Sequence, residues 1–132
     1  MLYTQLGKSG LVVSRLAMGT MLFGEGDYFG LKYTFNQARA NELISRSFDA
    51  GINLFDTAAS YNNGLGEQML GKALGTRRSE AIISTKIAFR TGTAAFQAGI
   101  SYKNIVDTAA RSLKNLGTDY IDILMLHNDD PI

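Results

Sequence analysis

Short apolar segments of extended character alternate with helix-like segments along most of this chain. The helix-like segments show apolar side chains three and four residues apart, and each is followed by a glycine that can stop a helix. Strands that alternate with helices predict a parallel sheet covered by helices, which is an α/β fold. The candidate strands are residues 15–18, 52–55, 81–85 and 120–126, and the candidate helices are residues 37–50, 66–74 and 101–116.

Other segments predict a hairpin, a loop and a helix cap. Residues 2–6 and 11–13 read as two short strands joined by a Gly-Lys-Ser-Gly turn. Residues 20–35 are rich in glycine and aromatic side chains and read as a long loop, within which Gly24 and Gly26 supply flexibility. Loops longer than the usual connection are often functional. Ser101 is a suitable N-cap for the third helix.

Length and composition predict a single globular domain. The chain has 132 residues, of which 45% are hydrophobic and 19% charged, and its formal net charge is +1. We expect one domain over residues 1–132, with the hairpin in residues 1–14 and the βα units in residues 15–132. The small net charge argues against binding to nucleic acid or to an anionic membrane. Because the chain has no cysteine, disulfides and thiolate metal sites are excluded. Without a signal peptide or a long apolar run, we expect a cytoplasmic protein.

Polar side chains stand where three of the candidate strands end. Asp56, Lys86 and His127 each follow an apolar strand, and Tyr61 lies five residues beyond Asp56. Each has an ordinary structural interpretation: a turn or capping aspartate, a solvated lysine, and a hydrogen-bonded histidine. Together they are more informative, because a parallel fold brings the carboxyl ends of its strands to one edge, where ligands bind.

This set of side chains suits the protonation of a carbonyl oxygen while hydride arrives at the carbonyl carbon. A tyrosine hydroxyl is a weak acid, with a pKa of about 10 in model peptides. A nearby ammonium group stabilises the phenolate, a carboxylate can hold that ammonium in place, and a histidine can orient the carbonyl. One histidine and one carboxylate are too few for an obvious metal site. The G-x-S-x-G elbow of a serine nucleophile is absent.

Several segments resemble the aldo-keto reductase family, in order and with suitable spacing. They are residues 10–24, residues 49–58 around Asp56, the Ser60-Tyr61 pair, residues 66–74, the Ser-Thr-Lys ending at Lys86, and residues 113–122 followed by Leu126-His127. The resemblance implies a (β/α)₈ barrel whose bottom is closed by an N-terminal hairpin. It also implies reduction of aldehydes and ketones by NADPH, without a metal or a Rossmann domain.

The resemblance also implies roles for individual residues. Asp56, Tyr61, Lys86 and His127 match the catalytic tetrad, with Tyr61 as the general acid. Gly19, Thr20 and Met21 match the segment near the nicotinamide, and Asp56 belongs to the same cofactor site. Three features depart from the family pattern: Asn62-Asn63 stands where many relatives have glycine, Gly66 replaces a common serine, and residues 30–35 have no recognised counterpart.

The length implies only the N-terminal half of such a barrel, since about 250 residues are typical of the whole. In the family, the other half holds the adenosine 2′-phosphate, much of the pyrophosphate and the platform under the nicotinamide. An open half-barrel would expose two sheet edges and an apolar interior face, so we expect a homodimer or higher homo-oligomer. Two alternatives to a small-carbonyl reductase remain: an inactive, truncated half-barrel that self-associates, and an interaction module that uses its sheet edges.

Overall fold

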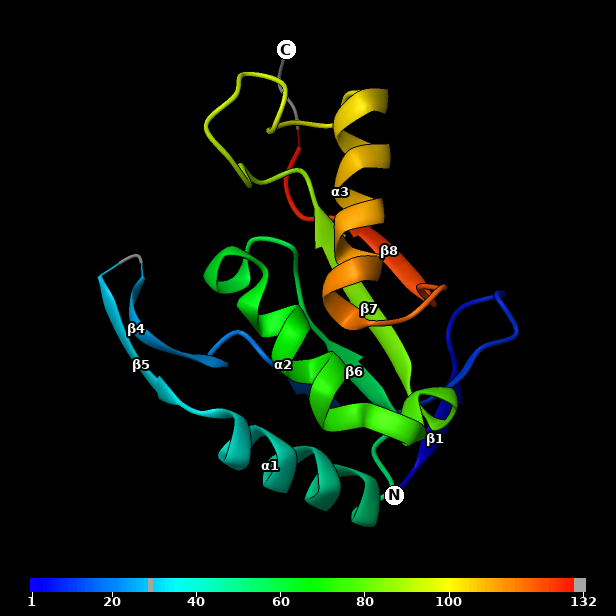
Figure 1. Cartoon of the computed structure of the whole chain (residues 1–132). Coiled ribbons are helices and arrows are strands. Elements are labelled where there is room, and N and C mark those ends of the chain that lie inside the picture. The colour runs from blue at the N-terminus through cyan, green and yellow to red at the C-terminus, as the bar shows by residue number, and fades with distance from the viewer. Residues whose placement is uncertain (29, 130–132) are drawn as a thin grey trace.

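Four parallel strands form the central sheet of the computed structural model, which describes residues 1–28 and 30–129. The predicted loop and domain extend over Phe29 and residues 130–132, which lie outside the described residues. In spatial order the strands are β3 (Ala17–Gly19), β6 (Leu54–Asp56), β7 (Ile82–Ile87) and β8 (Ile123–Leu126). The helices are α1 (Gln37–Asp49), α2 (Leu65–Leu74) and α3 (Tyr102–Leu116), with α2 between the other two (Figure 1). The predicted α/β fold with a parallel sheet is confirmed.

Local sequence explains where the long helices begin and end. The Asn36 side chain accepts a hydrogen bond from the Arg39 amide at 3.0 Å, which caps α1. Ser101 accepts from the Asn104 amide at 3.2 Å and caps α3, as predicted. Gly117, with φ of +64°, ends α3 in the left-handed conformation that glycine adopts without strain.

The core lies between the sheet and the helices. Phe55 of β6 and Ile83 of β7 are fully buried against side chains that include Ile44, Leu70 and Leu116 from the helices. Because side chains alternate across a strand, the residues next to Phe55 and Ile83 point to the opposite face of the sheet. That second face is the one that carries Asp56 and Lys86.

The N-terminal hairpin docks against the start of β6. Its strands are β1 (Tyr3–Gln5) and β2 (Val12–Ser14), paired antiparallel. The Asn53 side chain accepts from the Ser14 amide at 2.7 Å and donates to the Val12 carbonyl at 3.1 Å. The hairpin therefore lies at the amino ends of the parallel strands, away from the end that carries Asp56.

The prediction of a loop over residues 20–35 is wrong, because most of this segment is a second hairpin. Its strands are β4 (Gly24–Tyr28) and β5 (Leu31–Phe35), and Gly24 and Gly26 lie within β4. Asp27 stands opposite Lys32 across the pair, a favourable pairing of opposite charges. The Phe23 and Phe35 rings stack with centroids 5.5 Å apart and fix the base of the hairpin to the core. Tertiary packing thus overrides the weak strand propensity of glycine.

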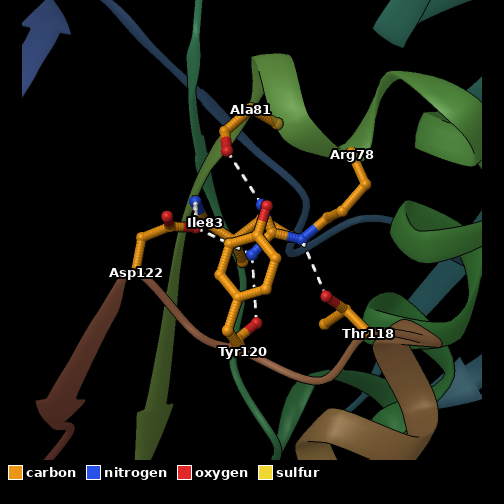
Figure 2. Close-up of polar contacts among 6 residues, drawn as sticks. All are labelled: Arg78, Ala81, Ile83, Thr118, Tyr120 and Asp122. Carbon is orange, nitrogen blue, oxygen red and sulfur yellow. Dashed lines mark hydrogen bonds and ion pairs between the residues drawn. The ribbon is translucent and has the colours of Figure 1, made fainter.

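A polar cluster joins the amino ends of β7 and β8 (Figure 2). It centres on Arg78, which belongs to the 3₁₀ helix η2 (Gly75–Glu80). The Arg78 guanidinium donates to Asp122 Oδ2 at 2.8 Å, the Ala81 carbonyl at 2.8 Å and the Tyr120 carbonyl at 3.0 Å, and lies 3.9 Å from the Tyr120 ring centroid. Asp122 Oδ2 also accepts from the Ile83 amide at 2.9 Å. The cluster therefore joins η2, the start of β7 and the loop before β8.

Within residues 1–28 and 30–129, no helix is both long enough and apolar enough to cross a membrane.

Candidate active site

Neighbouring strands bring the four predicted catalytic residues to one edge of the sheet. Asp56 is the last residue of β6, Lys86 is the penultimate residue of β7, and His127 directly follows β8. In the register of the sheet, Asp56 pairs with Ser84 and Lys86 pairs with Met125. The carboxyl ends of these parallel strands therefore converge, and Tyr61 joins them from the turn after β6.

The Lys86 ammonium is the centre of this group. Its Nζ donates to Asp56 Oδ2 at 2.6 Å, to the Thr57 carbonyl at 2.8 Å and to Tyr61 Oη at 3.2 Å. An ammonium group has three donors, so all three are used. The Lys86 side chain is only 11% exposed, and the Asp56 carboxylate offsets the cost of burying its charge. The three hydrogen bonds hold the ammonium against the tyrosine hydroxyl.

A tight turn fixes Tyr61 in place. It begins the 3₁₀ segment η1 (Tyr61–Gly64), in which Asn62 has φ of +47° and Asn63 has φ of +55°. Asparagine tolerates this left-handed region far better than most residues with a side chain, though less freely than glycine. Asparagine at these two positions is therefore compatible with the conformation of the turn.

The same turn contacts the second hairpin. Gly24 has φ of +129°, and a Cβ atom there would lie 2.0 Å from Asn62 Nδ2 and 3.3 Å from Leu65 Cδ2. No side chain fits in that space while Asn62 keeps its place. The turn that begins at Tyr61 and the start of β4 thus pack directly against each other.

His127 lies between two aromatic rings. Its ring centroid is 5.7 Å from that of Tyr61 and 4.6 Å from that of Phe89, and both pairs are edge to face. Burial, followed by the positive charge of Lys86, lowers the pKa of His127 below its ordinary value of 6.5, with a partial opposing effect from Asp56. The ring is therefore neutral near pH 7, and its buried Nδ1 has no hydrogen-bond partner among the described residues.

The predicted nicotinamide segment lies beside Asp56. Gly19 pairs with Asp56 across the sheet, and the Thr20 amide and hydroxyl donate to the Asp56 carbonyl at 2.9 and 3.1 Å. Thr20 is fully buried, whereas Met21 is 47% exposed. Nothing lies within 4 Å of a Cβ built on Gly19, which leaves open space next to the Asp56 strand end. An open glycine and an exposed apolar side chain beside the carboxylate suit a flat ring such as nicotinamide.

A cavity of about 310 Å³ opens over these residues. It is lined by Met21, Tyr33, Ser60, Tyr61, Phe89, Arg90 and His127. An open hollow of about 620 Å³ lies beside Arg78 and Tyr120 at the other end of the strands. The smaller cavity is the candidate site, because it contains two of the four convergent polar side chains and its walls are mostly apolar. Sequence reasoning missed Tyr33, Ser60, Phe89 and Arg90 as lining residues.

The positions of Phe89 and Arg90 could have indicated the site, since they lie two and three residues beyond the carboxyl end of the strand that holds Lys86. An unusual backbone conformation directs this segment. Ala88 is buried and has φ of +99°, a region that side-chain-bearing residues rarely adopt. Such strain is typical of functional sites. Tyr33 lies within residues 20–35, for which the sequence predicts a loop. The sequence pattern therefore does not predict that Tyr33 approaches the site.

Known proteins with similar sequences are longer than this chain. Proteins of Arabidopsis thaliana and of Oryza sativa, each described as "Probable voltage-gated potassium channel subunit beta", are 41% and 40% identical to it over 133 residues. Those alignments cover 98% of this chain and 38% of each relative. The chain thus spans less than half the length of the relatives it matches.

Solved structures agree in fold. A holo aldo-keto reductase from Bacillus halodurans superposes with a TM-score of 0.78 at 37% identity, over 96% of this chain and 40% of that one. A Pseudomonas aeruginosa protein assigned to the aldo-keto reductases gives a TM-score of 0.83 at 33% identity, over 98% of this chain and 49% of that one. The sheet is therefore half of a (β/α)₈ barrel, as expected from the sequence.

The model of the aldo/keto reductase family matches residues 15–132, which include every strand of the parallel sheet and all four residues at its carboxyl edge. The sequence match and the shared fold agree over nearly the whole chain. This chain belongs to the aldo/keto reductase family of oxidoreductases.

Proposed function

We propose that this chain carries the proton-transfer site of an NADPH-dependent reductase that acts on a small aldehyde or ketone. The observation that carries the proposal is the Lys86 ammonium, held by Asp56 at 2.6 Å and placed 3.2 Å from Tyr61 Oη. Because the Tyr61 oxygen accepts this hydrogen bond, its own proton remains available to a carbonyl oxygen in the cavity. Tyr61 is the general acid of the proposal.

The other two side chains support this step. As hydride reaches the carbonyl carbon, negative charge develops on the oxygen and then on the tyrosine after it gives up its proton. The Lys86 ammonium stabilises that phenolate through its fixed hydrogen bond. His127 is neutral near pH 7, so one ring nitrogen can donate to the carbonyl oxygen and orient it toward Tyr61.

The residues at the strand ends fit the nicotinamide end of NADPH. Gly19, which pairs with Asp56, has open space beside it, and Met21 lines the largely apolar cavity that holds Tyr61, so a flat ring beside Gly19 would lie near that cavity. The bound cofactor supplies the hydride. Asp56 has two tasks in this proposal, since it neutralises Lys86 and lies at the edge of the cofactor site.

The experiment has two parts. NADPH binding is measured by calorimetry, and oxidation of NADPH is then followed with a generic aldehyde. We expect Tyr61→Phe to lower the reduction rate by about a thousandfold, within the range that general acid catalysis supplies, while the circular dichroism spectrum is unchanged. No binding at millimolar NADPH would rule out the cofactor for this chain, and a retained rate in Tyr61→Phe would refute the role of the tyrosine.

A second proposal concerns self-association. The outer strands β3 and β8 have one free edge each among the described strands, and Leu124 and Leu126 of β8 are 43% and 58% exposed. Unpaired edges and exposed apolar strands favour pairing with another chain. Two copies related by a two-fold axis along the barrel would place β8 of one copy beside β3 of the other, in parallel. A monomeric mass at micromolar concentration in analytical ultracentrifugation would refute this arrangement.

A further inference from the structure

The β4–β5 hairpin reaches the cavity that Tyr61 and His127 line. Tyr33 of β5 is only 5% exposed, and it borders the same cavity as Tyr61 and His127. Side chains two residues apart on a strand share a face. Tyr33 therefore points in the same direction as Phe35, whose ring packs inward on Phe23 at 5.5 Å.

The base of the hairpin is fixed on both strands. On β5, Phe35 is held between the core ring of Phe23 and the Arg39 guanidinium, which lies 4.5 Å from the Phe35 centroid. On β4, Gly24 is packed against Asn62 and Leu65. These contacts fix the position of Tyr33 relative to the turn that begins at Tyr61. Tyr33 can therefore form part of the cavity wall.

Phe89 also lines this cavity. It stands edge to face with His127, with centroids 4.6 Å apart, and His127 stands in the same relation to Tyr61 at 5.7 Å. The cavity thus has four rings on its border, from Tyr33, Tyr61, Phe89 and His127. Aromatic rings attract another flat ring through edge-to-face and offset-stacked contacts, beyond what apolar area alone provides.

We propose that Tyr33 and Phe89 are specificity-determining residues, and that they select carbonyl compounds whose carbonyl group is attached to a planar ring. The inference rests on the proposed function for its choice of a carbonyl ligand. Tyr61 and His127 take the carbonyl oxygen, and Tyr33 and Phe89 contact the ring. A saturated ring of the same carbon count fills similar volume but lacks the flat faces that these contacts need.

The test compares two unreactive carbonyl probes, benzamide and cyclohexanecarboxamide. Each is titrated into the protein without cofactor, and binding is followed by the NMR shift of the Met21 methyl group, because Met21 lines the same cavity. We expect benzamide to bind about tenfold more tightly, the ratio that two aromatic contacts supply. A ratio near one, or an unchanged Met21 signal with both probes, would overturn the proposal.

Variants locate the source of the preference. Phe89 is 44% exposed, so Phe89→Leu is compatible with folding and should reduce the ratio to about threefold. Tyr33→Phe keeps the ring and should keep the ratio, whereas Tyr33→Leu should reduce it as Phe89→Leu does. Tyr102→Leu is the matched control, because Tyr102 is 84% exposed on α3 and does not line the cavity. An unchanged ratio in Phe89→Leu would show that the rings do not select the ligand.

Turnover separates this inference from the proposed function. The same variants are assayed with benzaldehyde and cyclohexanecarbaldehyde in the presence of NADPH, and the ratio of kcat/KM should follow the ratio of affinities. If the probes bind selectively but NADPH neither binds nor is oxidised, the proposed reduction fails and the ring selection stands. If both aldehydes are reduced at equal kcat/KM, the reduction stands and the ring selection fails.

Discussion

Two partly buried ion pairs lie at opposite ends of the parallel sheet, and their surroundings differ. At the amino ends, Arg78 and Asp122 are 14% and 16% exposed, and their other hydrogen bonds join them to the backbone of Ala81, Ile83 and Tyr120 and to the Thr118 hydroxyl. At the carboxyl ends, Lys86 and Asp56 are 11% and 31% exposed, and Lys86 directs a hydrogen bond to the Tyr61 hydroxyl beside a cavity.

The difference lies in the third partner of each pair. Backbone groups and the aliphatic hydroxyl of Thr118 do not titrate near pH 7, so the Arg78 cluster connects the loop before β8 to the start of β7 and has no proton to transfer. A tyrosine hydroxyl carries a transferable proton, so the Lys86 cluster can act on a ligand. The same type of ion pair therefore joins chain segments at one end of the sheet, and at the other end it holds the hydroxyl to which the proposed function assigns the proton transfer.

The largest effect is expected from Asp122→Ala. The substitution leaves the Arg78 guanidinium without its charge partner and the Ile83 amide without an acceptor, which should cost about 3 kcal/mol of the free energy of unfolding. Urea denaturation followed by circular dichroism measures the change. Asp119→Ala, at an exposed position in the same loop, is the control and should change stability by less than about 0.5 kcal/mol. Equal losses in the two variants would contradict the structural role of the pair.

Asp56→Asn should have the opposite signature. Lys86 keeps the Thr57 carbonyl and the Tyr61 hydroxyl, and the asparagine oxygen can still accept from it, so the free energy of unfolding should fall by about 2 kcal/mol, less than in Asp122→Ala. The rate of carbonyl reduction should fall by about a hundredfold, because the ammonium is less firmly held against the tyrosine. Glu42→Gln neutralises the exposed Arg46 pair in the same way and should alter neither quantity. A stability loss as large as that of Asp122→Ala would erase the distinction between the two ends.

Ala88→Gly tests whether the carboxyl end stores backbone strain. Glycine adopts φ of +99° freely, so relief of strain at this position should raise the free energy of unfolding by about 1 kcal/mol, offset in part by the greater freedom of the unfolded chain. Thermal denaturation gives the change. Ala73→Gly, within helix α2, is the matched control and should lower stability by about 1 kcal/mol. If both variants are destabilised alike, the conformation at Ala88 is not strained.

The smallest effect concerns pH. The pKa of His127 is lowered in the folded state, so the unfolded chain binds the proton more readily. Stability from this group is complete above the ordinary value of 6.5 and is lost as the pH falls below it and through the folded value. His127 is the only histidine in the chain, so His127→Gln should flatten the decline in stability between about pH 7 and pH 5. An identical decline in the variant and the unaltered protein would contradict the assigned shift.

Sequence reasoning succeeded where local chemistry and periodicity agree. Ser101 and Gly117 mark the ends of α3, and its buried residues Thr108, Ser112 and Leu116 are four residues apart, the spacing of one helix face. Asn104 is also buried there, because its amide donates to the Gly99 carbonyl at 2.7 Å. Periodicity cannot predict such a residue, since its burial depends on a partner supplied by another segment.

Part of the site was also predictable from local sequence pattern. Asp56, Lys86 and His127 follow apolar strands, and parallel pairing alone brings their positions together. Tyr33 was not predictable, because its place depends on a hairpin whose strands include two glycines and whose base is held by Phe23. The positive φ at Ala88 was equally hidden, since alanine gives no local signal of a left-handed backbone.

The contact between Gly24 and Asn62 has a consequence for variation in sequence. Any side chain larger than hydrogen at Gly24 requires a smaller residue at position 62 or a displacement of Asn62. A displacement of Asn62 would disturb the turn that begins at Tyr61. The two positions are therefore expected to change together rather than independently, and the energetic effects of substitutions at both should be non-additive. Through this pair, the evolution of the hairpin is constrained by the geometry of the turn that holds Tyr61.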